Sequence, residues 1–202
     1  MADLIDSGRE NIPEDRRLRL SIRWRHIVSE PSLAQELEGV LSIGLFIGDT
    51  PLFAPAVYGP EKKRSASASK KPGYFYGEDN GCALLHDLWR VLRTGELIDV
   101  EDYIENFFRL IVSPSGPLFA PACAESEWFD VLAIIQHGGS WHSDAMGGSG
   151  PAICLSVNRK DLLRFFYDLL DEALTESDDL SRKTLLESFD EALRQRQQLM
   201  QA

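Results

Sequence analysis

The stretch that decides the fold is residues 151–174, PAICLSVNRKDLLRFFYDLLDEAL. Residues 151–157 are rich in apolar side chains, which predicts a β-strand. Asn158 follows as a helix N-cap, and Asp161 lies three residues further on. An apolar stripe with helical spacing continues from there: Leu162, Phe165, Phe166, Leu169 and Leu170. Residues 158–174 are therefore predicted to form a capped helix directly after a strand.

Several segments outside this stretch also have strand patterns. Residues 18–28 (LRLSIRWRHIV) alternate apolar and polar side chains, which predicts a strand with one buried face and one arginine face in water. The apolar runs at 39–48 and 128–136 predict two more strands. Residues 74–77 (YFYG) are expected to begin a short one.

Helical spacing recurs in the middle and at the end of the chain. Residues 79–96 predict a helix that ends at Gly95. Residues 99–112 are predicted as another helix, N-capped by Asp99, although the end of this segment, FFRLIV, fits a strand as well. A long C-terminal helix is apolar at Leu185, Leu186, Phe189 and Leu193. This order of elements predicts an α+β fold, with a mostly antiparallel sheet packed against helices.

The length of 202 residues is typical of a single domain. Residues 1–16 are polar and are expected to be a flexible N-terminal segment, followed by a single α+β domain over 17–202. The polar segment 1–16 is not expected to be a secretory signal, and no apolar run reaches the roughly 20 residues that span a bilayer. The three cysteines lack metal-site spacing and are expected to be reduced, buried thiols. A cytoplasmic protein without membrane contact is therefore expected.

The hexapeptide PLFAPA occurs twice, at 51–56 and 117–122. Its two prolines are four residues apart, so both missing N–H donors fall on the same edge of an extended segment. Proline is tolerated in edge strands, where that side faces water. We therefore predict an edge or polyproline-like segment at each copy, although a duplication would also explain the repeat.

The net charge of −11 argues against nucleic acid as a direct partner and fits a basic protein partner. Acidic residues concentrate in two zones. The first contains Glu78, Asp79, Asp87, Glu96, Asp99, Glu101, Asp102 and Glu105, and the second contains Asp168, Asp171, Glu172, Glu176, Asp178 and Asp179.

The stretch at 137–150 (HGGSWHSDAMGGSG) combines five glycines with histidine, serine, tryptophan and aspartate. A nucleophile site, a metal site or a phosphate cradle would use such residues, but the stretch lacks a G-x-S-x-G elbow, a metal-ligand spacing and a P-loop lysine. Two interpretations of residues 137–150 are left, a flexible glycine loop and a loop that recognises another protein. We expect no catalytic residue, no cofactor and no bound metal.

The segments GVLSIGLFIGD, LLHDLWRVL and AICLSVNRKDLLRFFYDLL give an arrangement that resembles the immunity proteins of bacterial polymorphic-toxin and contact-dependent-inhibition systems. This resemblance covers about residues 18–175 and rests on the pattern of strands and helices. It implies a non-enzymatic inhibitor that binds and blocks a cognate toxin domain, often a basic nuclease. The candidate partner-binding residues come from the 99–105 part of the first acidic zone and from the glycine-rich loop: Asp99, Glu101, Asp102, Glu105, Trp141, His142 and Asp144.

Two other functions remain open. A small hydrolase or transferase would use the loop at 137–150. A structural or adaptor subunit of an assembly would present apolar surface, expected on the C-terminal helix.

Overall fold

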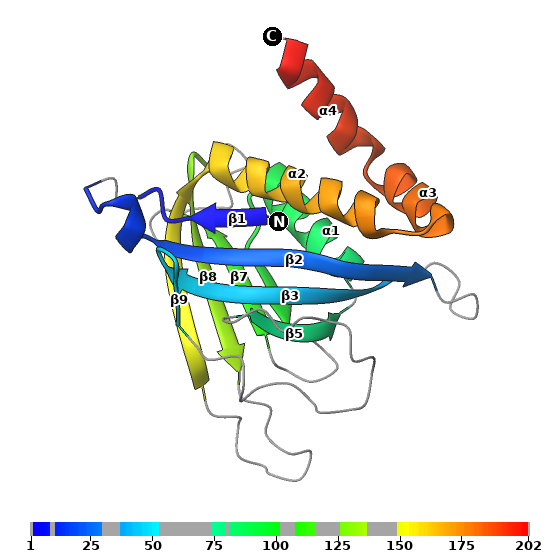
Figure 1. The fold of residues 1–202 in the computed structure, drawn as a ribbon. Helices are drawn as coiled ribbons and strands as arrows, with labels where there is room; N and C mark the ends of the chain where they lie inside the picture. The colour runs from blue at the N-terminus through cyan, green and yellow to red at the C-terminus, as the bar shows by residue number, and fades with distance from the viewer. Residues whose placement is uncertain are drawn as a thin grey trace, which may run out of the picture.

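The computed structural model describes residues 2–8, 11–29, 37–52, 74–79, 81–101, 108–115, 126–136 and 149–201. These residues form two antiparallel β-sheets and four α-helices, as the α+β prediction requires. Figure 1 shows the strands of the second sheet crossing behind those of the first at a steep angle, with α2 above β1 and α1 behind the first sheet.

The first sheet contains five strands: β1 (Ala2–Ile5), β2 (Leu18–Ser29), β3 (Leu37–Ile47), β4 (Thr50–Pro51) and β5 (Tyr74–Asp79). Its order is β1-β2-β3-β4, and β5 also pairs with β3. Gly48 forms the tight turn into β4 with a φ of +56°, and a Cβ there would lie 2.0 Å from the carbonyl oxygen of Asp15. The turn therefore requires glycine.

The second sheet follows chain order: β6 (Ile98–Glu101), β7 (Phe108–Pro114), β8 (Trp128–Gln136) and β9 (Ser149–Asn158). The helices are α1 (Gly81–Thr94), α2 (Arg159–Glu176), α3 (Asp179–Ser188) and α4 (Asp190–Gln201), and a short 3-10 turn, η1 (Glu14–Arg16), precedes β2. Helix α2 packs on β1 and β2, and α1 packs on β3 and β6.

One hydrophobic cluster joins the two sheets to α1 and α2. Alternation along the strands supplies it, because side chains at every second position of a strand point the same way. Large side chains that are almost completely buried fill its centre: Trp24, Phe129, Phe165, Phe166 and Phe189.

The strands expected at 18–28, 39–48, 128–136 and 151–157 are confirmed, as is the short strand that begins at Tyr74. The helices expected at 79–96 and 158–174 are confirmed too. Gly95 has a φ of +66°, and its N–H donates to the carbonyl of Val91 at 2.9 Å, as a C-terminal cap does. The Asn158 side chain accepts a hydrogen bond from the N–H of Asp161 at 2.9 Å.

The prediction of a helix over 99–112 is wrong. Asp99 lies inside β6, and Phe108–Pro114 form β7, with Phe108, Leu110 and Val112 buried at alternate positions. Pairing of β7 with β8 extends this segment, because the sheet ladder satisfies its backbone groups along the whole strand.

The long C-terminal helix is also corrected, since it is two helices, α3 and α4, that meet at Phe189. Phe189 has a φ of −114° and a ψ of 21° and is fully buried. The chain bends at the point where this ring enters the core.

The N-terminal segment is not loose over residues 2–8, contrary to expectation. β1 pairs with β2, and Leu4 is buried. The buried carboxylate of Asp6 accepts a hydrogen bond from the N–H of Ser156 at 3.2 Å, and the N–H of Gly8 donates to the carbonyl of Ser156 at 2.7 Å. These residues therefore tie the first sheet to strand β9 of the second.

Three smaller expectations meet the structure in part. Pro51 lies in the edge strand β4, whereas residues 53–56 and the second PLFAPA copy lie outside the described residues. Cys154 is exposed on β9, so the prediction of a buried thiol is wrong for it. None of the helices described here is both long enough and apolar enough to cross a bilayer.

Candidate functional site

The outer face of α2 holds a row of acidic residues. Five residues line a hollow of about 410 Å³ there: Asp168, Asp171, Glu172, Thr175 and Glu176. We call it the acidic hollow. The spacing of these residues puts them on one face of the helix, because positions three and four apart are neighbours on a helical surface.

The helix that carries the acidic hollow is firmly held in the fold. Its opposite face buries Leu162, Phe165, Phe166, Leu169 and Leu170 in the core. The carboxylates therefore project from a backbone that packing fixes in place, which lowers the cost of ordering them when a partner binds.

Two of the four carboxylates have arginine partners from other elements. Arg196 of α4 forms a two-pronged ion pair with Asp171, with both nitrogen–oxygen distances at 2.6 Å. The hydrogen bonds that Arg196 donates to Asp171 raise the pKa of Arg196 above its usual value. Arg23 of β2 lies 3.3 Å from Glu172. Arg23 belongs to the face of β2 that was predicted to lie in water, but its side chain is only partly exposed and places a cation beside the acidic hollow.

Asp168 and Glu176 form no ion pair within the described part of the chain. Glu176 is exposed, and Asp168 is half-buried near Arg196. The acidic hollow therefore keeps a net negative charge after its two arginine neighbours are counted.

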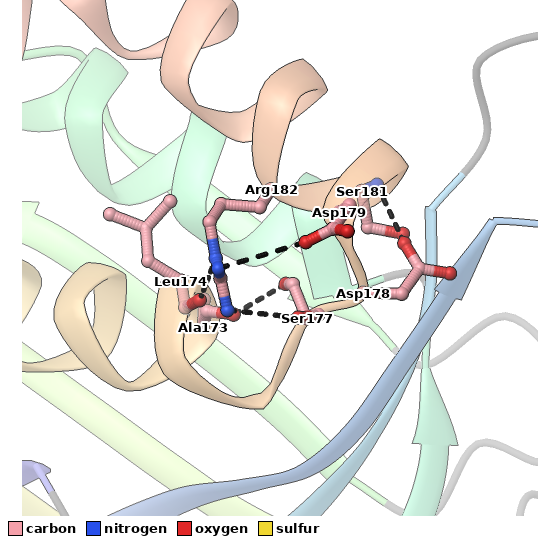
Figure 2. Close-up of polar contacts among 7 residues, drawn as sticks. All are labelled: Ala173, Leu174, Ser177, Asp178, Asp179, Ser181 and Arg182. Carbon is pink, nitrogen blue, oxygen red and sulfur yellow. Dashed lines mark hydrogen bonds and ion pairs between the residues drawn. The ribbon is translucent and has the colours of Figure 1, made fainter.

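A network of hydrogen bonds and one ion pair joins the last turn of α2 to the start of α3 (Figure 2). The Arg182 guanidinium donates to the carbonyl of Leu174 at 2.9 Å and to that of Ser177 at 3.3 Å, and it lies 3.9 Å from Asp179. These carbonyls belong to the last turn of α2 and to its cap, where backbone acceptors lack helical partners. Asp178 caps α3 by accepting from the N–H of Ser181 at 2.7 Å.

The first predicted site is only partly described. Asp99 and Glu101 both belong to strand β6. The Asp99 carboxylate accepts two hydrogen bonds from Arg109, at 2.8 Å and 2.5 Å, and these bonds lower the pKa of Asp99. Because Arg109 offsets the charge of Asp99, Asp99 is less suited to contact a basic partner.

The other predicted site residues lie outside the described residues: Asp102, Glu105, Trp141, His142 and Asp144. They remain predictions. Within the described ranges, no group of three or more histidine, cysteine or carboxylate side chains is placed to hold a metal ion.

The acidic hollow was visible in the sequence as the second acidic zone. The signal that marks it is carboxylates at positions 168, 171, 172 and 176, which recur with helical spacing on a segment that was already predicted to be helical. The sequence favours the 99–105 zone instead because its carboxylates cluster within a short stretch of the chain.

The described residues form an α+β fold with a row of carboxylates on the outer face of α2. Comparison of the chain with protein-family models, with curated proteins and with solved structures finds no match.

Proposed function

We propose that this protein is a non-enzymatic inhibitor of the immunity type, which binds a basic protein domain and blocks it. The observation that carries the proposal is the acidic hollow, a row of carboxylates on a helix whose other face is locked into the core. The net charge of −11 also favours a basic partner.

The physical mechanism is attraction followed by occlusion. An acidic surface steers a basic partner into productive encounters and raises the association rate, most strongly at low salt. A toxin domain that acts on nucleic acid needs a cationic groove. Carboxylates that enter this groove would exclude its substrate.

Each carboxylate has a distinct role in this proposal. Asp168 and Glu176, which lack ion-pair partners in the described part of the chain, meet cationic side chains of the partner directly. Asp171 and Glu172 act together with Arg196 and Arg23, and these ion pairs orient them.

An adaptor role is less well supported by the described surface. The exposed large apolar residues of the described chain are Ile47, Leu97, Trp128, Leu180, Leu186 and Leu199. Half of them lie on the C-terminal helices, where an adaptor is expected to present apolar surface: Leu180 and Leu186 on α3 and Leu199 on α4. The other half lie elsewhere in the fold. A hydrolase or transferase role would rest on residues 137–150, most of which lie outside the described residues.

The experiment that tests the proposal uses the tagged full-length chain as bait in a lysate of its native host. The captured material is washed at low salt and then at high salt. We expect a stoichiometric basic protein that leaves as the salt rises and whose activity the purified chain inhibits. A captured protein whose activity is unaffected by the chain would contradict the proposal, as would the absence of a partner at either salt.

A further inference from the structure

A second hollow, of about 330 Å³, lies where α1, α2 and α4 meet, and its lining is cationic and apolar. Six residues line it: Trp89, Leu92, Arg93, Arg159, Leu163 and Gln195. We call it the arginine hollow. Its volume is at the lower end of the range for small-molecule sites, about 300–1,000 Å³.

The apolar part of the arginine hollow is rigid. The Trp89 side chain is 8% exposed and stacks on Phe166, with ring centroids 5.3 Å apart and an interplanar angle of 21°. Leu92 and Leu163 complete this surface from α1 and α2. Packing therefore fixes the apolar part of the hollow before any ligand binds.

The two arginines are held in different ways. Arg159, the first residue of α2, donates a hydrogen bond to the carbonyl of Leu92 at the end of α1. Arg93 forms an ion pair with Glu191 of α4 at 3.0 Å, and both of these side chains are about half exposed, at 52% and 56%. An exposed pair of this kind contributes little stability, so Arg93 can exchange one carboxylate for another at little cost.

We propose that the arginine hollow binds a small organic anion, a carboxylate attached to a flat apolar body. The apolar body lies against Trp89, and the ligand carboxylate takes the place of Glu191 on Arg93. Arginine suits this role because its planar fork matches the geometry of a carboxylate. In an acidic protein that repels anions at long range, recognition depends on these local cations.

The test is a calorimetric titration of the full chain with 2-naphthoate, compared with the neutral 2-naphthamide of the same shape. We expect the acid to bind at least about tenfold more tightly than the amide, as for a hydrogen bond to a charged group. Equal affinities for acid and amide would overturn the proposal, as would no detectable binding of the acid at millimolar concentration.

Three variants locate the binding. Arg93→Gln should weaken naphthoate binding about tenfold. Glu191→Gln should strengthen it, because that variant removes the competing carboxylate from Arg93. Arg90→Gln is the matched control, since Arg90 is exposed on the same helix, pairs with Asp87 and does not line the hollow. All three positions are exposed, so circular dichroism should show an unchanged fold.

Equal effects of Arg93→Gln and Arg90→Gln would overturn the assignment, and so would weaker binding in Glu191→Gln. A free small acid and a peptide C-terminus share the proposed chemistry. N-acetylphenylalanine therefore serves as a second probe, and its binding should depend on Arg93 as the binding of naphthoate does. The tighter of the two probes indicates the source of the natural ligand.

Discussion

At the scale of single residues, two buried serines at the α2–α3 corner, Ser177 and Ser181, differ in the hydrogen bonding of their hydroxyls (Figure 2). The hydroxyl of Ser177 donates to the carbonyl of Ala173 at 2.5 Å, which satisfies a backbone acceptor at the end of α2. The hydroxyl of Ser181 is buried and has no hydrogen-bond partner among the described residues. A made hydrogen bond contributes net stability, whereas a buried polar group without one carries a desolvation cost.

We therefore expect Ser177→Ala to lower the free energy of unfolding by about 1 kcal/mol. Ser181→Ala should leave it unchanged or raise it slightly, because alanine removes the unsatisfied hydroxyl and keeps the backbone N–H that Asp178 caps. Urea denaturation of the two variants measures both effects. Equal losses in both variants would show that the Ser181 hydroxyl has a partner.

A second residue-scale prediction concerns Asp99. Because Arg109 lowers the pKa of Asp99, the ion pair stabilises the fold above the ordinary pKa of 3.8. This contribution is lost as the pH falls through the lowered pKa of the folded state. Both side chains are more than a third exposed, so it is small, less than about 1 kcal/mol.

Asp99→Asn should therefore be slightly less stable than the wild-type protein at neutral pH, and the difference should vanish in strong acid. Asp130→Asn is the control, because it removes a carboxylate from an exposed position on β8 of the same sheet. Urea denaturation over a pH series checks this. A difference between Asp99→Asn and the wild type that persists at the lowest pH would rule out the ion pair as its cause.

At the scale of elements, the N-terminal strand is the sharpest departure from the sequence-based expectation. Leu4 is 1% exposed, whereas Ile5 points to the other face of the sheet and is half-buried. Leu4→Ala should lower the free energy of unfolding by about 2–5 kcal/mol, as for other buried leucines.

Ile5→Ala serves as the matched control and should cost at most about 1 kcal/mol. Thermal and urea unfolding of both variants give the comparison. If residues 1–16 were loosely attached, as their polar composition predicts, Leu4→Ala would have no measurable effect.

The elements that the sequence predicted correctly carry their signals locally. In α2, the Asn158 cap and the apolar stripe lie within one helix length, so no distant contact is needed to recognise them. The segment 99–112 carries apolar residues that fit either period, and only its pairing with β8 decides for a strand. β1 has four residues, too few to show a period before β2 provides its partner.

The candidate site divides in the same way. The carboxylates of the acidic hollow follow helical spacing and are visible in the sequence. The arginines that pair with these carboxylates cannot be recognised from the sequence. Arg196, for example, lies 25 residues away from Asp171 and reaches it only after the bend at Phe189. The neutralisation of Asp99 also depended on a strand pairing that periodicity did not predict.

At the scale of the whole molecule, the proposal is that charge placement, and not only net charge, determines partner binding. Asp168 and Glu176 lie on the acidic hollow. Glu14 and Asp15 are exposed on η1, at the opposite end of the molecule from α3 (Figure 1). Two double variants, Asp168→Lys with Glu176→Lys and Glu14→Lys with Asp15→Lys, change the net charge by the same amount at these two places.

The central measurement is the dissociation constant of the captured basic partner for the wild-type chain and for these two double variants, at two salt concentrations. We expect the Asp168/Glu176 variant to lose at least about tenfold in affinity and to show a weaker salt dependence than the wild type. The Glu14/Asp15 variant should stay close to the wild type. Equal losses in both variants, or no loss in either, would contradict the claim that the acidic hollow is the contact surface.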